Sequence, residues 1–134
     1  TDNETGNSAF AKYNEIARSV WDIINAAAQA GDVKRVYMLS HTQNSEDGNV
    51  KIKTIGKLLD EKITIEGMFT MVMRTHVNQG EYLFGTHNSG HDTVKTPLGM
   101  FAGDYIPNDL KAVDAAITDF YGIDAIVNPA TNAA

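Results

Sequence analysis

The sequence predicts an α/β fold in which a short central sheet with a β-hairpin is flanked by helices. Three patterns indicate it: a long amphipathic helix near the start, a short apolar segment after it, and two alternating segments around a polar turn. A length of 134 residues fits one domain, and a hydrophobic fraction of 43% is enough to form a core. We therefore expect residues 1–134 to form a single domain with flexible ends at residues 1–8 and 123–134.

The first predicted element is a helix over residues 7–30. Its apolar side chains recur in steps of three and four, so they share one face: Phe10, Tyr13, Ile16, Ala17, Val20, Trp21, Ile24 and Ala28. Asn7 or Ser8 can cap the start of this helix, and Gly31 can end it.

The middle of the chain predicts one strand and one mixed segment. Residues 35–40 (RVYMLS) predict a strand buried on both faces, because the run is short, apolar and contains β-favouring residues. The polar residues 41–49 that follow predict an exposed loop. Residues 50–62 predict an extended start that becomes helical near Lys57, with Thr54 as its cap.

The last third of the chain predicts a hairpin, a loop and a helix. Residues 69–77 and 81–86 surround the turn sequence Asn78-Gln79-Gly80, which is typical of a β-hairpin. Residues 87–96 predict a loop. Residues 108–121 predict the final helix, capped by Asn108 or Asp109.

The composition excludes several classes of protein. A net charge of -6 argues against a stand-alone basic nucleic-acid coat protein, although a local basic loop is compatible with it. The absence of cysteine excludes a disulfide framework, a thiolate zinc site and a catalytic cysteine. Because no apolar run approaches the roughly 20 residues that span a bilayer, we expect a soluble chain without a membrane partner.

A polar cluster follows the predicted buried strand and consists of Ser40, His41, Thr42 and Gln43. Ligands of open parallel sheets bind beyond the carboxyl ends of the strands, so this cluster is placed to sense a phosphate or orient a water. The alternative is an ordinary polar loop at the end of a strand.

Two sets of lysines are candidates for phosphate contacts. Lys51, Lys53 and Lys57 lie close to two glycines and could bind backbone phosphates of a nucleic acid. Lys95, two residues before Pro97, could act as an inserted cation at a phosphate. The alternative for both sets is an ordinary solvated surface lysine.

Other catalytic motifs are missing from the sequence. His87 and His91 are four residues apart, but metal binding would need a third ligand, so we expect no metal site. The chain contains no G-x-x-x-x-G-K-[ST], no G-x-G-x-x-G and no G-x-S-x-G. It should therefore not hydrolyse ATP by itself.

Several segments taken in order carry a family resemblance. SHTQNSEDGNVKIKTIGKLLDEKITIEGMF, then DTVKTPLGMF, then IPNDLKAVDAAITDFYG resemble the C-terminal half of phage-encoded, RecA-like P-loop ATPases, a family of nucleotide-binding and recombination proteins. The resemblance runs from about Phe10 to about Tyr121 and implies a partial RecA-like fold. The Walker A loop and the Walker B strand of that family would lie before Thr1.

The resemblance also implies roles for the candidate residues. Ser40, His41, Thr42 and Gln43 would form the sensor between nucleotide and DNA, and residues 43–54 would be the loop that holds single-stranded DNA. Lys51 and Lys53 would then contact phosphates, and Lys95 would reach the ATP of a neighbouring subunit. ATP and Mg²⁺ would bind only together with the upstream half, in an oligomer in the bacterial cytoplasm.

A second hypothesis comes from a different class of function. The chain could be a free-standing phage protein that binds and inhibits a host protein such as a defence nuclease, in the manner of an anti-CRISPR. The missing P-loop and the acidic charge favour this alternative. In either case a half sheet has an open edge, which a second copy or a protein partner would cover.

Overall fold

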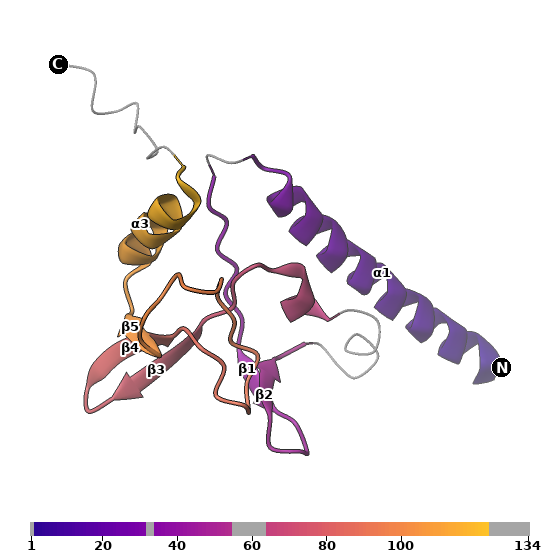
Figure 1. Ribbon diagram of the computed structural model, residues 1–134. Coiled ribbons are helices and arrows are strands. Elements are labelled where there is room, and N and C mark those ends of the chain that lie inside the picture. Colours follow the sequence, from indigo (N-terminus) through magenta and orange to yellow (C-terminus); the bar gives the residue numbers. More distant parts are fainter. Residues whose placement is uncertain (1, 32–33, 55–63, 124–134) are drawn as a thin grey trace.

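The computed structural model describes residues 2–31, 34–54 and 64–123. Two antiparallel sheets and two helices make up these ranges, so the fold is mixed α/β (Figure 1). The elements in chain order are α1 (Asp2–Ala28), β1 (Thr42–Asn44), β2 (Val50–Ile52), the short 3-10 helix η1 (Ile65–Met68), β3 (Arg74–Asn78), β4 (Glu81–Gly85), β5 (Tyr105–Pro107) and α3 (Leu110–Tyr121).

Helix α1 confirms the first predicted element but begins earlier, at Asp2. It ends at Ala28, and Gly31 follows with a φ of 92°, a conformation that glycine adopts without strain. Ala17 and Ile24 are buried on one face, seven residues apart as a helical stripe requires. In Figure 1 α1 lies apart from both sheets.

The prediction of a doubly buried strand at residues 35–40 is wrong. This segment has no strand assignment, and its apolar side chains are exposed: Val36, Tyr37, Met38 and Leu39. Leu39 exposes 88% of its surface. The apolar pattern identifies side chains that suit the interior of a sheet. In the described part of the chain, however, no strand pairs with this segment.

The exposed loop predicted at residues 41–49 is confirmed at residues 45–49 and wrong at residues 42–44, which form β1. β1 pairs with β2 in an antiparallel hairpin, in which Gln43 is opposite Lys51. The extended start predicted for residues 50–62 is confirmed by β2, whereas its helical part, with Lys57, lies outside the described residues. The residues of β1 are polar, and they form a strand because they pair with β2.

The hairpin predicted around Asn78-Gln79-Gly80 is confirmed by β3 and β4. Asn78 pairs with Glu81, which leaves Gln79 and Gly80 as a two-residue turn. Both have positive φ, 49° and 82°, as the type I′ turn of a hairpin requires. β5 pairs with the other edge of β4, so β4 is the central strand of this sheet.

Helix α3 confirms the final predicted helix, with both ends capped. The side chain of Asp109 accepts a hydrogen bond from the N–H of Lys111. At the other end Gly122 has a φ of 62°, and Ile123 N–H donates to Thr118 O. The helix therefore begins and ends where its local sequence dictates.

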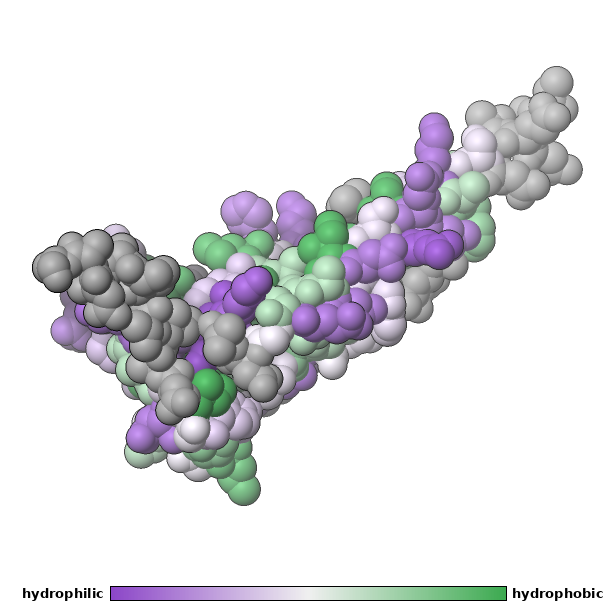
Figure 2. Space-filling view, turned by 90° about the horizontal axis from the view of Figure 1, so that it is seen from above, coloured by the Kyte–Doolittle hydropathy of each residue, from purple (hydrophilic) through white to green (hydrophobic). Residues whose placement is uncertain are grey.

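Few apolar side chains of the described ranges are fully enclosed. The buried ones are Ala17, Ile24, Phe84, Val94 and Val113. Figure 2 shows hydrophobic side chains spread among hydrophilic ones over the visible face. Neither described helix has the length and apolar character needed to cross a membrane.

Candidate functional site

The β1–β2 hairpin brings two sets of predicted site residues together. The N–H of Lys53 donates to His41 O over 2.7 Å, and Gln43 is opposite Lys51. Residues that are opposite each other share a face of the hairpin, and so do residues two apart on one strand. The residues on one face are therefore His41, Gln43, Lys51 and Lys53. One face of the hairpin therefore carries two lysines next to half of the polar cluster.

Ser40 lies where the extended segment enters this hairpin. Its hydroxyl donates to His41 O at 3.1 Å and reaches Lys53 O at 3.5 Å. Thr42, opposite Ile52, belongs to the other face of the hairpin. Ser40 thus lies at the start of the hairpin. The rest of the polar cluster is divided, with His41 and Gln43 on one face and Thr42 on the other.

The tip of the hairpin is held by its own polar side chains. Asp47 accepts hydrogen bonds from the Ser45 hydroxyl, from Asn49 N–H at 3.2 Å and from Asn49 Nδ2 at 2.7 Å. These hydrogen bonds lower the pKa of the exposed Asp47 carboxyl, and the bond from Ser45 has the largest effect. Gly48 completes the turn with a φ of 83°. The tip therefore has a defined conformation.

The outer edge of β2 is tied to two other segments. Val50 N–H donates to His91 O at 2.8 Å, and Ile52 N–H donates to Glu66 Oε1 at 2.9 Å. Glu66 lies in η1, and His91 belongs to the loop before Lys95. Both contacts satisfy backbone donors of an edge strand and fix the position of the hairpin.

Lys95 combines a fixed backbone with an exposed side chain. Its N–H donates to Val72 O and its carbonyl accepts from Val72 N–H, both at 2.9 Å. The preceding residue, Val94, is 2% exposed, whereas Lys95 itself is exposed. Lys95 therefore lies on an isolated bridge to Val72 and not on the β1–β2 hairpin.

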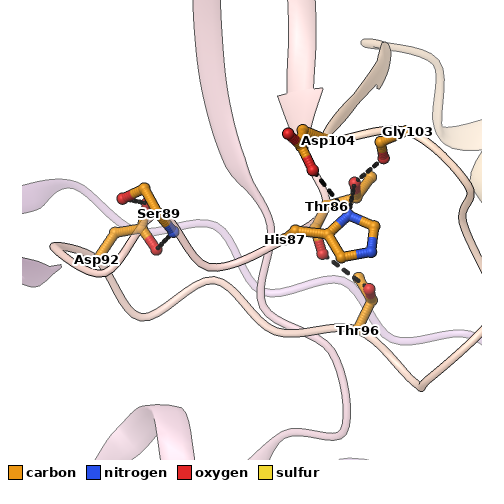
Figure 3. Close-up of polar contacts among 7 residues, drawn as sticks. All are labelled: Thr86, His87, Ser89, Asp92, Thr96, Gly103 and Asp104. Atoms are coloured by element: carbon orange, nitrogen blue, oxygen red, sulfur yellow. Dashed lines mark hydrogen bonds and ion pairs between the residues drawn. The ribbon is translucent and has the colours of Figure 1, made fainter.

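A buried threonine connects the segment of Lys95 to the sheet (Figure 3). Thr86, directly after β4, is fully buried, and its hydroxyl donates to Gly103 O. Its N–H donates to Asp104 O at 2.9 Å, and its carbonyl accepts from the Thr96 hydroxyl at 2.7 Å. Through these bonds, the side chain and the two backbone groups of Thr86 link β4 to two loops.

The ring of His87 contacts the same threonine. His87 Nδ1 lies 2.9 Å from Thr86 Oγ1 and 3.6 Å from Asp104 Oδ1. Because the hydroxyl hydrogen of Thr86 points to Gly103 O, its oxygen is left to accept from His87. The hydrogen-bond pattern therefore assigns a hydrogen to Nδ1.

The loop that carries His91 is held by hydrogen bonds among its own residues. The carboxylate of Asp92 accepts from the Ser89 hydroxyl at 2.8 Å and from Val94 N–H at 3.1 Å (Figure 3 shows the first). Asn88 Nδ2 donates to Asp92 O at 2.8 Å. Within the described ranges, no three histidine or acidic side chains gather in a way that could hold a metal ion.

The exposed apolar segment is attached to α3 by Arg35. Its Nε lies 3.0 Å from Asp114 Oδ1, and the two side chains form an ion pair. Arg35 Nη2 also donates to Thr118 Oγ1 at 3.2 Å. Nearby, partial burial and then the charge of Asp114 raise the pKa of Tyr37. These contacts hold the segment against one face of α3.

Sequence reasoning identified part of this arrangement. It named the polar cluster, Lys51, Lys53 and Lys95 from residue type and order. It missed Thr86, and the only signal for that residue is a polar side chain directly after an apolar strand. It also missed the contact between Arg35 and Asp114, which no local pattern indicates.

Comparisons of the chain with protein-family models, with curated proteins and with solved structures found no match.

Proposed function

We propose that this chain is the C-terminal half of a RecA-like phage ATPase that acts on single-stranded DNA and is not catalytic by itself. In this proposal Ser40, His41, Thr42 and Gln43 sense the nucleotide, and Lys51 and Lys53 bind DNA phosphates. Lys95 reaches the nucleotide of a neighbouring subunit. ATP and Mg²⁺ would be held by the upstream half, which carries the P-loop.

The observation that carries the proposal is the segment formed by residues 36–39. It is extended and apolar, it is exposed, and it leads directly into Ser40. Single exposed apolar residues are common on protein surfaces, but four in succession with strand-forming character favour a sheet interior. A central strand of a larger sheet would have these properties if the strands beside it belonged to the upstream half of the protein.

The hairpin supports the second part of the proposal. The segment that corresponds to the DNA-binding loop carries Lys51 and Lys53 on the same face as His41 and Gln43. A DNA phosphate bound by these lysines would therefore act on the polar cluster without an intervening element. This short path favours coupling between DNA and nucleotide.

The fixed backbone of Lys95 supports a role in trans. A cation stabilises a transferring phosphoryl group best when it is preorganised, and the bridge to Val72 fixes the backbone from which the Lys95 side chain extends. The side chain is exposed and so can extend toward a second subunit. This geometry favours a homo-oligomer in which each chain completes the site of its neighbour.

The experiment is ATP turnover by the complete gene product, whose intact mass and N-terminal sequence are determined first. Lys95→Ala should lower the DNA-stimulated rate by about a thousandfold, as loss of an inserted cation does. Lys111→Ala, which removes an exposed lysine of α3, should leave the rate unchanged. Equal rates for the two variants would contradict the role of Lys95.

A product that begins at Thr1 would contradict the ATPase proposal as a whole. The function of the chain would then be sought in binding to a host protein. A pull-down with basic host nucleases is the corresponding measurement, because the chain carries a net charge of -6.

A further inference from the structure

We infer that Thr86 is the positioning residue of Lys95: its buried hydroxyl, its N–H and its carbonyl hold the segment of Lys95 at a fixed place relative to the three-stranded sheet. The inference rests on the proposed function of Lys95 and adds a residue to it. Thr86 does not contact the reacting groups in this account.

The first argument is the burial of a polar group. Thr86 is the buried polar side chain of the described ranges, with 0% of its surface exposed. Valine has the same shape and would avoid the cost of burying a hydroxyl. The hydroxyl is useful at this place because it donates to Gly103 O and accepts from His87 Nδ1.

The second argument is the direction of the bonds around Thr86. β4, the central strand, ends immediately before it and provides a rigid reference. The carbonyl of Thr86 accepts from the hydroxyl of Thr96, the residue next to Lys95. Lys95 is thus held twice, by its own bridge to Val72 and by Thr96 on Thr86.

The third argument is the link between the hydroxyl and the peptide group of Thr86. The hydroxyl fixes the loop at Gly103, and the N–H fixes the adjacent Asp104 through its carbonyl at 2.9 Å. Removing the hydroxyl leaves the carbonyl of Gly103 and Nδ1 of His87 without this partner. The loop would then loosen, and with it the orientation of the peptide that accepts from Thr96.

The test is a set of Thr86 variants in the complete gene product. Thr86→Val keeps the shape and removes the hydroxyl, whereas Thr86→Ser keeps the hydroxyl. We expect Thr86→Val to lower the DNA-stimulated kcat by about 10- to 100-fold, the effect of a misplaced catalytic group. Thr86→Ser should restore most of the rate, and Thr75→Val, at an exposed position of β3, should not change it.

A double-mutant cycle separates positioning from a merely structural effect. If Thr86 acts through Lys95, Thr86→Val should cause no further loss in a Lys95→Ala background. Hydrogen exchange of the Lys95 and Val72 amides should be faster in Thr86→Val and normal in Thr86→Ser. This second measurement does not depend on ATP turnover.

The outcomes distinguish the two proposals. If Lys95→Ala abolishes turnover and Thr86→Val leaves both turnover and exchange unchanged, the inference is wrong and the proposed function stands. Additive losses in the cycle would also overturn it. If the complete product shows no turnover at all, the proposed function fails, and unchanged exchange at Lys95 in Thr86→Val would overturn the placement by Thr86 as well.

Discussion

The main-chain N–H of Lys53 donates a 2.7 Å hydrogen bond to the carbonyl oxygen of His41. This bond closes the open end of the β1–β2 hairpin and places a lysine beside the polar cluster. The hydroxyl of Ser40 reaches the carbonyl of the same lysine at 3.5 Å. A displacement of Lys53 would therefore also displace Ser40 and His41, which precede β1.

The turn between β3 and β4 should depend on Gly80. Its φ of 82° lies in the left-handed region, and open space surrounds the position of an added Cβ. Gly80→Ala should therefore lower the free energy of unfolding by about 1 kcal/mol through backbone conformation alone. Urea denaturation measures it, with Gly67→Ala as the control, because that glycine does not have a positive φ.

Helix α3 should depend on its N-terminal cap. Asp109→Ala removes the acceptor of the Lys111 N–H and should cost about 1 kcal/mol of unfolding free energy. Asp119→Ala removes an exposed carboxylate near the other end and should cost nothing measurable. Equal effects of the two substitutions in thermal unfolding followed by circular dichroism would contradict the assignment of the cap.

The tip of the β1–β2 hairpin should be sensitive to acid. The pKa of Asp47 is lowered in the folded chain, so its contribution to stability is present above the ordinary pKa of a carboxyl and is lost as the pH falls through the lowered value. Ser45→Ala removes the main cause and should raise the pKa of Asp47 toward its ordinary value. NMR titration of the carboxyl carbon measures this shift, and Ser89→Ala is the matched control.

The contact between Arg35 and α3 should be visible at Tyr37. The negative charge of Asp114 helps to raise the pKa of this phenol, after partial burial. Asp114→Asn should therefore lower the pKa of Tyr37, as followed by NMR of the tyrosine ring. Asp119→Asn, farther along α3, should leave it unchanged, and a Tyr37 pKa that responds equally to both would contradict the placement of the segment on the helix.

The elements that local sequence determines were predicted correctly. The turn at Gln79 and Gly80 and the cap at Asp109, one of the two capping residues expected, each involve neighbours within a few residues, so their patterns are sufficient. The strand predicted at residues 35–40 depends on burial by distant partners. Its side chains have strand-forming character, but the described part of the chain contains no strand beside it.

The hairpin formed by β1 and β2 was missed for a related reason. Thr42, Gln43 and Asn44 are polar and lack the alternation that identifies a strand, so pairing with β2 decides their conformation. Residue type alone identified Lys51 and the polar cluster. It did not indicate that they share a hairpin, because that depends on the register set by the turn at residues 45–49.

The most direct test of the account is the stimulation of ATP turnover by single-stranded DNA in the complete gene product with Lys51→Ala and Lys53→Ala combined. The control combines Lys12→Ala and Lys34→Ala, which remove two exposed lysines outside the hairpin. The account predicts that the first variant loses DNA stimulation while its DNA-independent turnover remains, and that the control keeps both. Equal stimulation in the two variants would contradict the role of the hairpin in coupling DNA to the nucleotide.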